Sequence, residues 1–253
     1  MRLRNLLAVV ALFFVALLVT FMIPSISATG QNKPPYKVTG DEASLLGTIS
    51  FAGMPPKPKQ IDLSSDPMCE SINPDAPTED VVVTDGKLAN VIVYARSGDS
   101  LDTYSFEVPS TEVLLEHKRC QYAPRALGLM VQQTLKIVNS DLTIHKTHLV
   151  ARNNREWSQA QPPGADPIEQ RFPLPEFYVA MRDDQHPWQK AVVGVFSHPF
   201  FSVSATDGSY KITGLPAGHY TLTAWHEKYG EQTVDVSVGS RQNKTLDFTF
   251  KDK

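Results

Sequence analysis

The sequence predicts an all-β protein. Short runs of β-branched and aromatic residues recur along the chain, separated by Asp-Gly and Pro-x-Gly turns, and this spacing is typical of an antiparallel sandwich or barrel. The 19 prolines and 14 glycines are spread along the chain, as many short turns require. Beyond the N-terminal segment no convincing helical pattern is found, although the loop at 152–170 has room for a short helix.

The N-terminal segment predicts export from the cytoplasm. Basic residues precede the apolar run Leu6–Ile23, which is followed by Pro24 and by the segment Ser-Ile-Ser-Ala (25–28), which supplies small residues. This order is typical of a signal peptide, while the length of the run is also close to the lower limit for a membrane span. Residues 1–27 are therefore expected to be a cleaved signal peptide or a retained anchor, and the polar residues 28–42 a linker. The location expected is periplasmic or otherwise extracytoplasmic.

The charge of the exported part excludes one class of partner. Without Arg2 and Arg4, the 24 basic residues fall to 22 against 27 acidic ones, a net charge of −5. No basic patch stands out, so a nucleic acid is not expected as a partner.

Three sections of strands are expected after the linker. Residues 43–102 hold N-terminal strands, notably 46–51 and 88–95. Residues 103–197 form a second group, in which residues 152–170 are expected to be a loop. Residues 198–253 form the most regular group. The strands expected in the second and third groups are 104–108, 112–115, 126–130, 134–139, 145–151, 172–180, 191–196, 200–205, 210–212, 220–225, 231–238 and 244–250.

The two cysteines, Cys69 and Cys120, are expected to form a disulfide, because cysteines in an oxidising compartment usually pair. The alternative is a free thiol that acts as a ligand or nucleophile. The motif C-x-x-C-H is absent, so covalent haem is excluded.

The C-terminal section resembles a known domain family. Residues 206–238 read TDGSYKITGLPAGHYTLTAWHEKYGEQTVDVSV, which is similar to carboxypeptidase regulatory-like domains, small transthyretin-like β-sandwiches. The N-terminal LLGTISFAGMPPKP is similar to the opening strand of such a domain. The resemblance implies that both ends contribute to this type of sandwich, and it leaves open whether they build one sandwich or two.

The middle section resembles the cupredoxins, Greek-key barrels that bind copper. The stretch LKIVNSDLTIHKTH (135–148) is similar to the strand and loop that deliver the first histidine ligand, which implies that role for His145. The stretch FPLPEFYVAMRDDQHPWQKAVVGV (172–195) looks like the part that delivers the remaining ligands, and CQYAPRALGLMVQQTLKI looks like the preceding hairpin. The combination of these stretches with HPW (186–188) and WHE (225–227) also looks like a group of bacterial secreted proteins that pair these two domain types.

The ligand pattern departs from that of the related secreted proteins, which read Cys-x-x-His-Pro-Trp-Met. Here Asp183 stands at the Cys position and Gln189 at the Met position, while His186 is kept. Blue-copper electron transfer needs a thiolate ligand, which Asp183 cannot supply. The resemblance therefore implies the fold but not a blue-copper centre.

Two imidazoles and a carboxylate could still bind metal. The proposed ligands are His145, His186 and Asp183, a set that suits non-blue Cu(II) or Zn(II), with Gln189 as a weak oxygen ligand. His148 would face away from His145 if both lie in one strand, and joins the site only if that strand starts late or bulges. The opposing interpretation is a degenerate site in which these histidines pack and form hydrogen bonds.

Two functions follow as hypotheses. One is an exported cupredoxin-like protein that binds copper without a thiolate, in copper handling or redox chemistry. The other is a metal-free structural or interaction module that docks to an envelope or membrane redox complex. The partner expected is a protein of the cell envelope, with membrane contact only through an uncleaved N-terminal segment. Motifs of hydrolases and nucleotide-binding enzymes are absent, so no catalytic residue is assigned and an enzyme is not expected.

Overall fold

The computed structural model describes residues 33–252, which form nineteen strands and two short helices. The prediction of an all-β protein is confirmed. The expected signal peptide or anchor at 1–27 lies outside the described residues. Within 33–252, no helix combines the length and apolar character that crossing a membrane requires.

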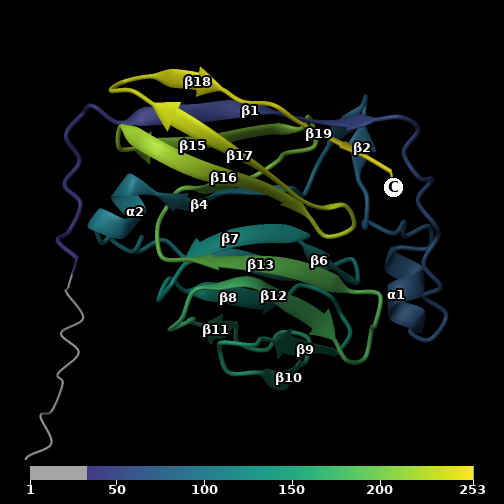
Figure 1. Cartoon of the computed structure of the whole chain (residues 1–253). Coiled ribbons are helices and arrows are strands. Elements are labelled where there is room, and N and C mark those ends of the chain that lie inside the picture. The colour runs from purple at the N-terminus through teal and green to yellow at the C-terminus, as the bar shows by residue number, and fades with distance from the viewer. Residues whose placement is uncertain (1–32, 253) are drawn as a thin grey trace, which may run out of the picture. The chain divides into compact units, whose positions relative to one another are not determined.

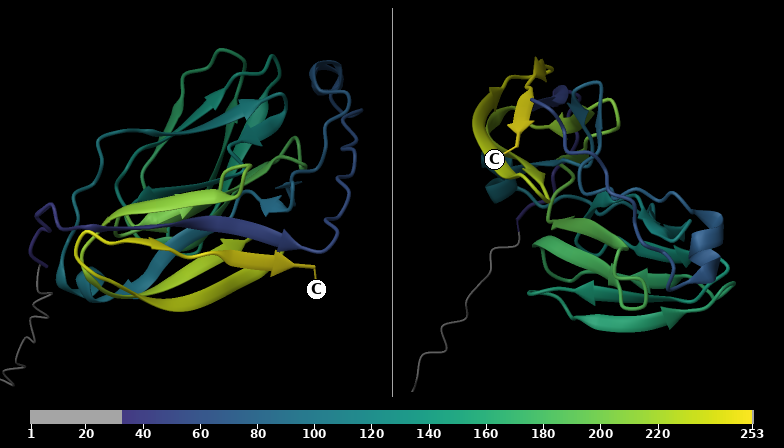
Figure 2. Two further views of the ribbon diagram at one scale, coloured as in Figure 1. Left: turned by 90° about the horizontal axis from the view of Figure 1, so that it is seen from above. Right: turned by 90° about the vertical axis from the view of Figure 1, so that its right-hand side faces the viewer.

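Strands from both ends of the chain build one sandwich (Figure 1). In one sheet, β1 pairs antiparallel with β15 and β3 and parallel with β18 and β19, and β3 pairs with β2. The other sheet has the order β14-β4-β16-β17. In Figure 2 the purple β1 and the yellow C-terminal strands run side by side. The strand bounds are β1 Ala43–Ala52, β2 Val83–Thr84, β3 Lys87–Leu88, β4 Ile92–Gly98, β14 Phe201–Val203, β15 Ser209–Leu215, β16 Gly218–His226, β17 Gly230–Val238, β18 Asn243–Thr245 and β19 Phe248–Lys251.

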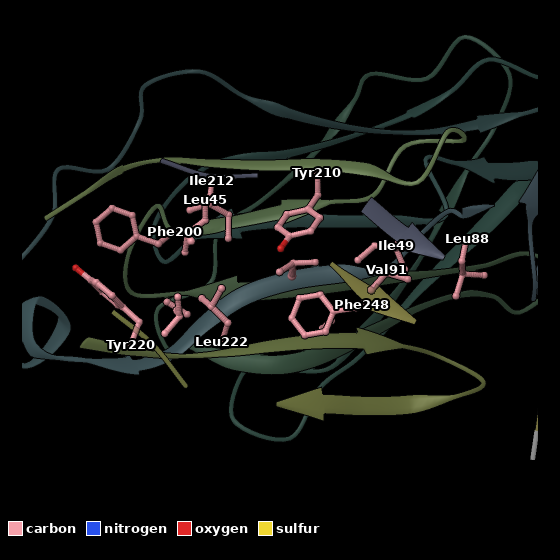
Figure 3. Packing of buried hydrophobic residues seen from close by; sticks show 14 of the residues in the cluster. Leu45, Ile49, Leu88, Val91, Phe200, Tyr210, Ile212, Tyr220, Leu222 and Phe248 are labelled. Atoms are coloured by element: carbon pink, nitrogen blue, oxygen red, sulfur yellow. The ribbon is translucent and has the colours of Figure 1, made fainter. Parts of the chain in front are cut away.

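The core of this terminal sandwich draws on residues distant in sequence. Alternate residues of a strand face the same side, so Leu45 and Ile49 of β1 point inward together. They meet Ile212 of β15, Leu222 of β16 and Phe248 of β19 in the interior (Figure 3). Because these side chains come from both ends of the chain, the sandwich needs both ends to bury its core.

The middle of the chain forms a second sandwich. One sheet has the order β10-β9-β12-β13-β7 and the other β11-β8-β5-β6. The pairs β13–β7 and β5–β8 are parallel, and the remaining pairs are antiparallel. The strand bounds are β5 Val113–Lys118, β6 Gln121–Ala123, β7 Ala126–Met130, β8 Leu135–Asn139, β9 His145–Val150, β10 Trp157–Gln161, β11 Ile168–Gln170, β12 Glu176–Asp183 and β13 Lys190–Phe196.

The two helices, α1 (Pro67–Ile72) and α2 (Asp99–Thr103), were not expected from the sequence. Asp66 caps α1, since its Oδ1 accepts hydrogen bonds from the backbone N–H groups of Met68 and Cys69 at 2.8 and 3.1 Å. Proline follows the cap at the first helical position, where its missing N–H costs nothing. Both helices are too short to show a helical hydrophobic period, so Asp-Pro was the one sequence feature that indicated α1.

Two further assignments differ from expectation, since residues 152–170 were expected to be a loop and residues 104–108 a strand. The expected loop at 152–170 contains β10 and β11, and 104–108 forms only an isolated bridge, between Ser105 and Pro35. Residues 33–42, expected as part of a linker, lie against the folded part. The backbone N–H of Tyr36 donates to the Ser105 carbonyl at 2.8 Å, and the Tyr36 ring packs against Tyr104 at 5.3 Å. The aromatic ring explains why this polar stretch packs instead of extending into solvent.

Candidate metal centre

A disulfide carries the α1 segment to the end of the middle sandwich. Cys69 and Cys120 are bonded to each other and fully buried, 51 residues apart in sequence. The Asn73 amide donates to the Arg119 carbonyl at 3.0 Å, and the Trp188 indole N–H donates to the Cys120 carbonyl at 2.9 Å. The segment that precedes β2 therefore supplies residues to a site built mainly by the middle sandwich.

Three of the predicted ligands converge on one point. His145 Nδ1 lies 2.8 Å from Asp183 Oδ2 and 3.0 Å from His186 Nδ1, and the last two atoms are 3.2 Å apart. All three residues are buried. His145 begins β9, Asp183 ends β12 beside it, and His186 follows in the turn. The strand pairing thus brings together residues nearly forty positions apart.

Asp183 also organises its own turn. Its Oδ1 accepts hydrogen bonds from the backbone N–H groups of Gln185 at 2.8 Å, His186 at 3.0 Å and Lys146 at 3.2 Å. Oδ1 is thus used by the backbone, while Oδ2 faces the two imidazoles. A carboxylate at this position both shapes the loop and presents one oxygen to the site.

The outer nitrogen of each imidazole is held by a carboxylate. His145 Nε2 lies 3.0 Å from Asp141 Oδ2, and His186 Nε2 lies 2.9 Å from Asp66 Oδ2. Since a carboxylate only accepts, each Nε2 carries a hydrogen and donates it. The same arrangement fixes the tautomer of histidines that bind metals, because it leaves the other ring nitrogen free as a ligand.

The three converging atoms form a point that protons or a metal ion can occupy. When both histidines are neutral and donate through Nε2, their Nδ1 lone pairs face each other and the anionic Asp183 oxygen. When a histidine is protonated, its Nδ1 donates a hydrogen bond to that oxygen. Burial acts to raise the pKa of Asp183, but hydrogen bonds from both imidazoles and from the backbone outweigh it and hold the pKa well below the usual value. Burial acts to lower the pKa of both histidines, and their carboxylate partners outweigh it, so both pKa values are raised. Protons and a metal ion thus compete for this point.

Asp66 and Asp141 were not singled out from the sequence. Burial acts to raise the pKa of Asp66, but hydrogen bonds from Thr143 and His186 and from the α1 backbone lower it to about 2. Burial likewise opposes the hydrogen bond from His145, which with two backbone N–H bonds lowers the pKa of Asp141. Asp66 lies 120 residues from its histidine, and no local pattern connects them. Asp141 stands four residues before its histidine, a spacing that could have indicated the pair.

Gln189 reaches the same point, as the resemblance implied. Its side-chain Nε2 lies 3.0 Å from His145 Nδ1, and its Oε1 lies 2.9 Å from His117 Nδ1. Amide nitrogen and oxygen are assigned from their contacts, and rotation of the amide by a half turn exchanges them. In the rotated state the oxygen faces the converging ligands, where it can act as a weak fourth ligand.

His117 of β5 is a further buried residue near the candidate centre that was not singled out from the sequence. Its ring stacks on that of His145, its Nε2 lies 2.9 Å from Thr147 Oγ1, and its Nδ1 lies 3.9 Å from Asp183 Oδ2. Burial, with the neighbouring His145 charge, lowers its pKa to about 4, so it is neutral at pH 7. It follows buried Leu115 by two positions, so both side chains lie on the inner face of β5. This spacing in the sequence indicates that the residue is buried but not that it belongs to a site.

His148 does not join the site. It lies in β9 with His145, and three positions along a strand turn it to the outer face. There its Nδ1 lies 2.8 Å from Asp184 Oδ1 and its Nε2 lies 3.1 Å from Glu156 Oε1, with 26% of the side chain exposed. The condition set by the sequence, a late start or a bulge, is not met because β9 already begins at His145.

The comparisons with known proteins concern two parts of the chain. Residues 179–251 match the family model of the carboxypeptidase regulatory-like domain. This match confirms the resemblance stated for residues 206–238. It begins within β12 of the middle sandwich and continues to β19, so it also includes Asp183, His186 and Gln189. No curated protein matches the sequence of this chain.

Solved copper proteins are similar to part of the chain. A copper-containing nitrite reductase from Thermus scotoductus SA-01 shows 15% identity over 35% of this chain and 23% of its own, with a TM-score of 0.32. A purple cupredoxin from Nitrosopumilus maritimus shows 18% identity over 33% of this chain and 98% of its own, with a TM-score of 0.28. A Cu(I) form of an amicyanin mutant shows 18% identity over 42% and 98%, with a TM-score of 0.30. The chain thus spans less than a quarter of the nitrite reductase.

Proposed function

We propose that this chain is an extracytoplasmic, cupredoxin-like copper protein that binds Cu(II) through His145 Nδ1, His186 Nδ1 and Asp183 Oδ2, without a thiolate. The observation that carries the proposal is the convergence of these three atoms, 2.8 to 3.2 Å apart. Both cysteines are used in the disulfide, so neither is free to make a blue-copper centre. The disulfide also supports an oxidising compartment.

The choice of Cu(II) over Zn(II) rests on the affinity of nitrogen and oxygen ligands for copper and not on the spacing of the ligand atoms. Ligands about 2.0–2.1 Å from a metal lie roughly 2.9 Å apart at right angles and roughly 3.4 Å apart in a tetrahedron. The three separations, 2.8, 3.0 and 3.2 Å, lie close to one or the other of these values, so the spacing fits either metal. Copper binds such sites more tightly than the other divalent metals of its row.

The role we propose is to hold or transfer copper, or to exchange electrons slowly, with an envelope protein as partner. Two features support a function in binding over one in catalysis. The ligands are buried, and their outer nitrogens are fixed by Asp141 and Asp66, so the site is rigid. Rigidity of this kind favours retention of a metal at the end of a sandwich.

The test is copper content and electron paramagnetic resonance of the protein without residues 1–27, loaded with Cu(II). We expect stoichiometric copper with nitrogen hyperfine coupling and no intense blue absorption. The double variant His145→Ala, His186→Ala should lose this signal, whereas His148→Ala, a histidine of the same strand outside the site, should keep it. A wild-type protein that retains no copper after dialysis would sink the proposal and favour a metal-free interaction module.

A further inference from the structure

The disulfide lies directly beside the candidate metal centre. The Cys69 sulfur, a ring nitrogen of His186 and a carboxylate oxygen of Asp66 all lie within 4.8 Å of one another. The Cys120 sulfur forms the same kind of group with His145 and Asp141. The two sulfurs therefore adjoin the residues that fix both imidazoles, and the candidate centre uses neither of them as a ligand.

We infer that reduction of this disulfide creates a Cu(I) site formed by the thiolates of Cys69 and Cys120. A dithiol reductant supplies two electrons and two protons, breaks the S–S bond and is itself oxidised to a disulfide. One Cu⁺ then forms a bond to each sulfur, and the two thiol protons pass to water. Soft thiolates select Cu(I), whereas imidazole and carboxylate suit Cu(II).

The sulfurs stay adjacent after reduction because other bonds hold the two segments together. The Cα atoms of Cys69 and Cys120 are 5.6 Å apart. Asn73 and Arg119 exchange two hydrogen bonds, of 3.0 and 3.1 Å, and the Gln121 amide donates to the Pro77 carbonyl at 3.0 Å.

Further contacts hold the start of α1 and the turn that carries Cys120. Thr143 Oγ1 donates to Asp66 Oδ2 at 2.7 Å, beside the cap of α1. The backbone N–H groups of Arg119 and Cys120 donate to the two oxygens of Asp141 at 2.7 and 2.8 Å. These bonds do not involve sulfur, so the reduced thiols are positioned as a pair.

The inference goes beyond the proposed function and does not require it. If both sites bind, the chain offers adjoining sites of different chemistry to the two oxidation states of copper. In that case the two thiolates bind Cu(I), and the His–Asp group binds Cu(II).

The test begins with the folded protein without residues 1–27, reduced anaerobically with dithiothreitol. The reductant is removed, free thiols are counted and circular dichroism checks the fold. Cu(I) is then titrated in competition with a coloured Cu(I) chelator. We expect one Cu(I) retained per reduced chain and none per oxidised chain, and X-ray absorption of the loaded protein should show two sulfur neighbours.

Two variants separate this site from the His–Asp centre. The reduced His145→Ala, His186→Ala variant should retain Cu(I), because it keeps both thiols. The Cys69→Ser, Cys120→Ser variant should lose it, and X-ray absorption of the wild type decides the ligands if that variant does not fold. Failure of the reduced wild type to retain Cu(I), copper with no sulfur neighbour, or a disulfide reducible only on unfolding would each overturn the inference. Cu(II) resonance of the oxidised protein tests the proposed function alone, so the two failures are distinguishable.

Discussion

The imidazole rings of His117 and His145 are parallel, with centroids 4.2 Å apart and an interplanar angle of 1°. His117 also holds Gln189 through Nδ1 and Thr147 through Nε2. The candidate ligand His145 thus packs against the neutral, buried ring of His117, which helps to fix its orientation.

His117→Ala should weaken copper binding although His117 is not one of the proposed ligands. Loss of the ring leaves a cavity beside His145 and frees Gln189, so we expect copper affinity to fall roughly 10–100-fold. The free energy of unfolding should fall by about 2–4 kcal/mol. Chelator competition and urea denaturation measure the two effects. His148→Ala is the matched control, and equal copper affinity in the two variants would contradict the role given to His117.

Asp183→Cys should convert the centre toward a blue-copper site. The substituted side chain would place a sulfur beside His145 and His186, and a Cu(II)–thiolate bond in such surroundings absorbs visible light strongly. We expect an intense visible band on addition of Cu(II) to this variant. Asp184→Cys, at the exposed neighbouring position, should give none. A copper-loaded Asp183→Cys protein without the band would show that position 183 does not face the metal.

Asp66→Asn should lower copper affinity by roughly 10–100-fold, because the carboxylate that orients His186 becomes a neutral amide. Asp66 also caps α1, but asparagine caps helices about as well as aspartate, so the cap is expected to be kept in this variant. Competition titration measures the affinity, and Asp62→Asn, an exposed aspartate of the same segment, provides the comparison. An affinity unchanged from the wild type would mean that His186 needs no carboxylate partner.

Acid should destabilise the terminal sandwich through two buried histidines. Burial lowers the pKa of His198 to about 4, and burial together with Arg125 and Lys228 lowers that of His226 to about 4. The unfolded chain, with histidine pKa values near 6.5, binds more protons as pH falls from about 6.5 to 4, so the free energy of unfolding decreases through that window.

His198 and His226 should each lower the free energy of unfolding by up to about 3 kcal/mol at the acid end of the window. Urea denaturation at several pH values measures the slope for the wild type and for His198→Gln. The variant should show a shallower decline, while His219→Gln, at an exposed position, should follow the wild type. If the free energy of unfolding of His198→Gln depends on pH as steeply as that of the wild type, buried His198 does not contribute to acid destabilisation.

Removal of the disulfide in Cys69→Ala, Cys120→Ala should destabilise the fold by about 4 kcal/mol, since the bond closes a loop of 51 residues in the unfolded chain. Reversible thermal or urea denaturation measures this difference. A loss below about 1 kcal/mol would indicate that the loop is already ordered in the unfolded state.

The sequence predicted more of the site than of its surroundings. His145, Asp183, His186 and Gln189 converge as the family resemblance implied, because the resemblance gave their places in strand and turn. His117, Asp66 and Asp141 hold these residues from other segments, and tertiary packing alone brings them near. Interior strands were recognised from their alternation, whereas α1 and α2 were missed because one turn of helix has no period to detect.

The pairing of β1 has a consequence for folding during synthesis. Its long antiparallel partner β15 and its parallel partner β19 lie far along the chain, so they are synthesised long after β1. The middle sandwich, whose strands pair among themselves, can fold earlier. Until β15 and β19 are synthesised, β1 lacks these partners, and apolar strands with unpaired edges associate readily with other chains. The interval before the C-terminal strands are made is therefore the stage at which a chaperone would be of most use.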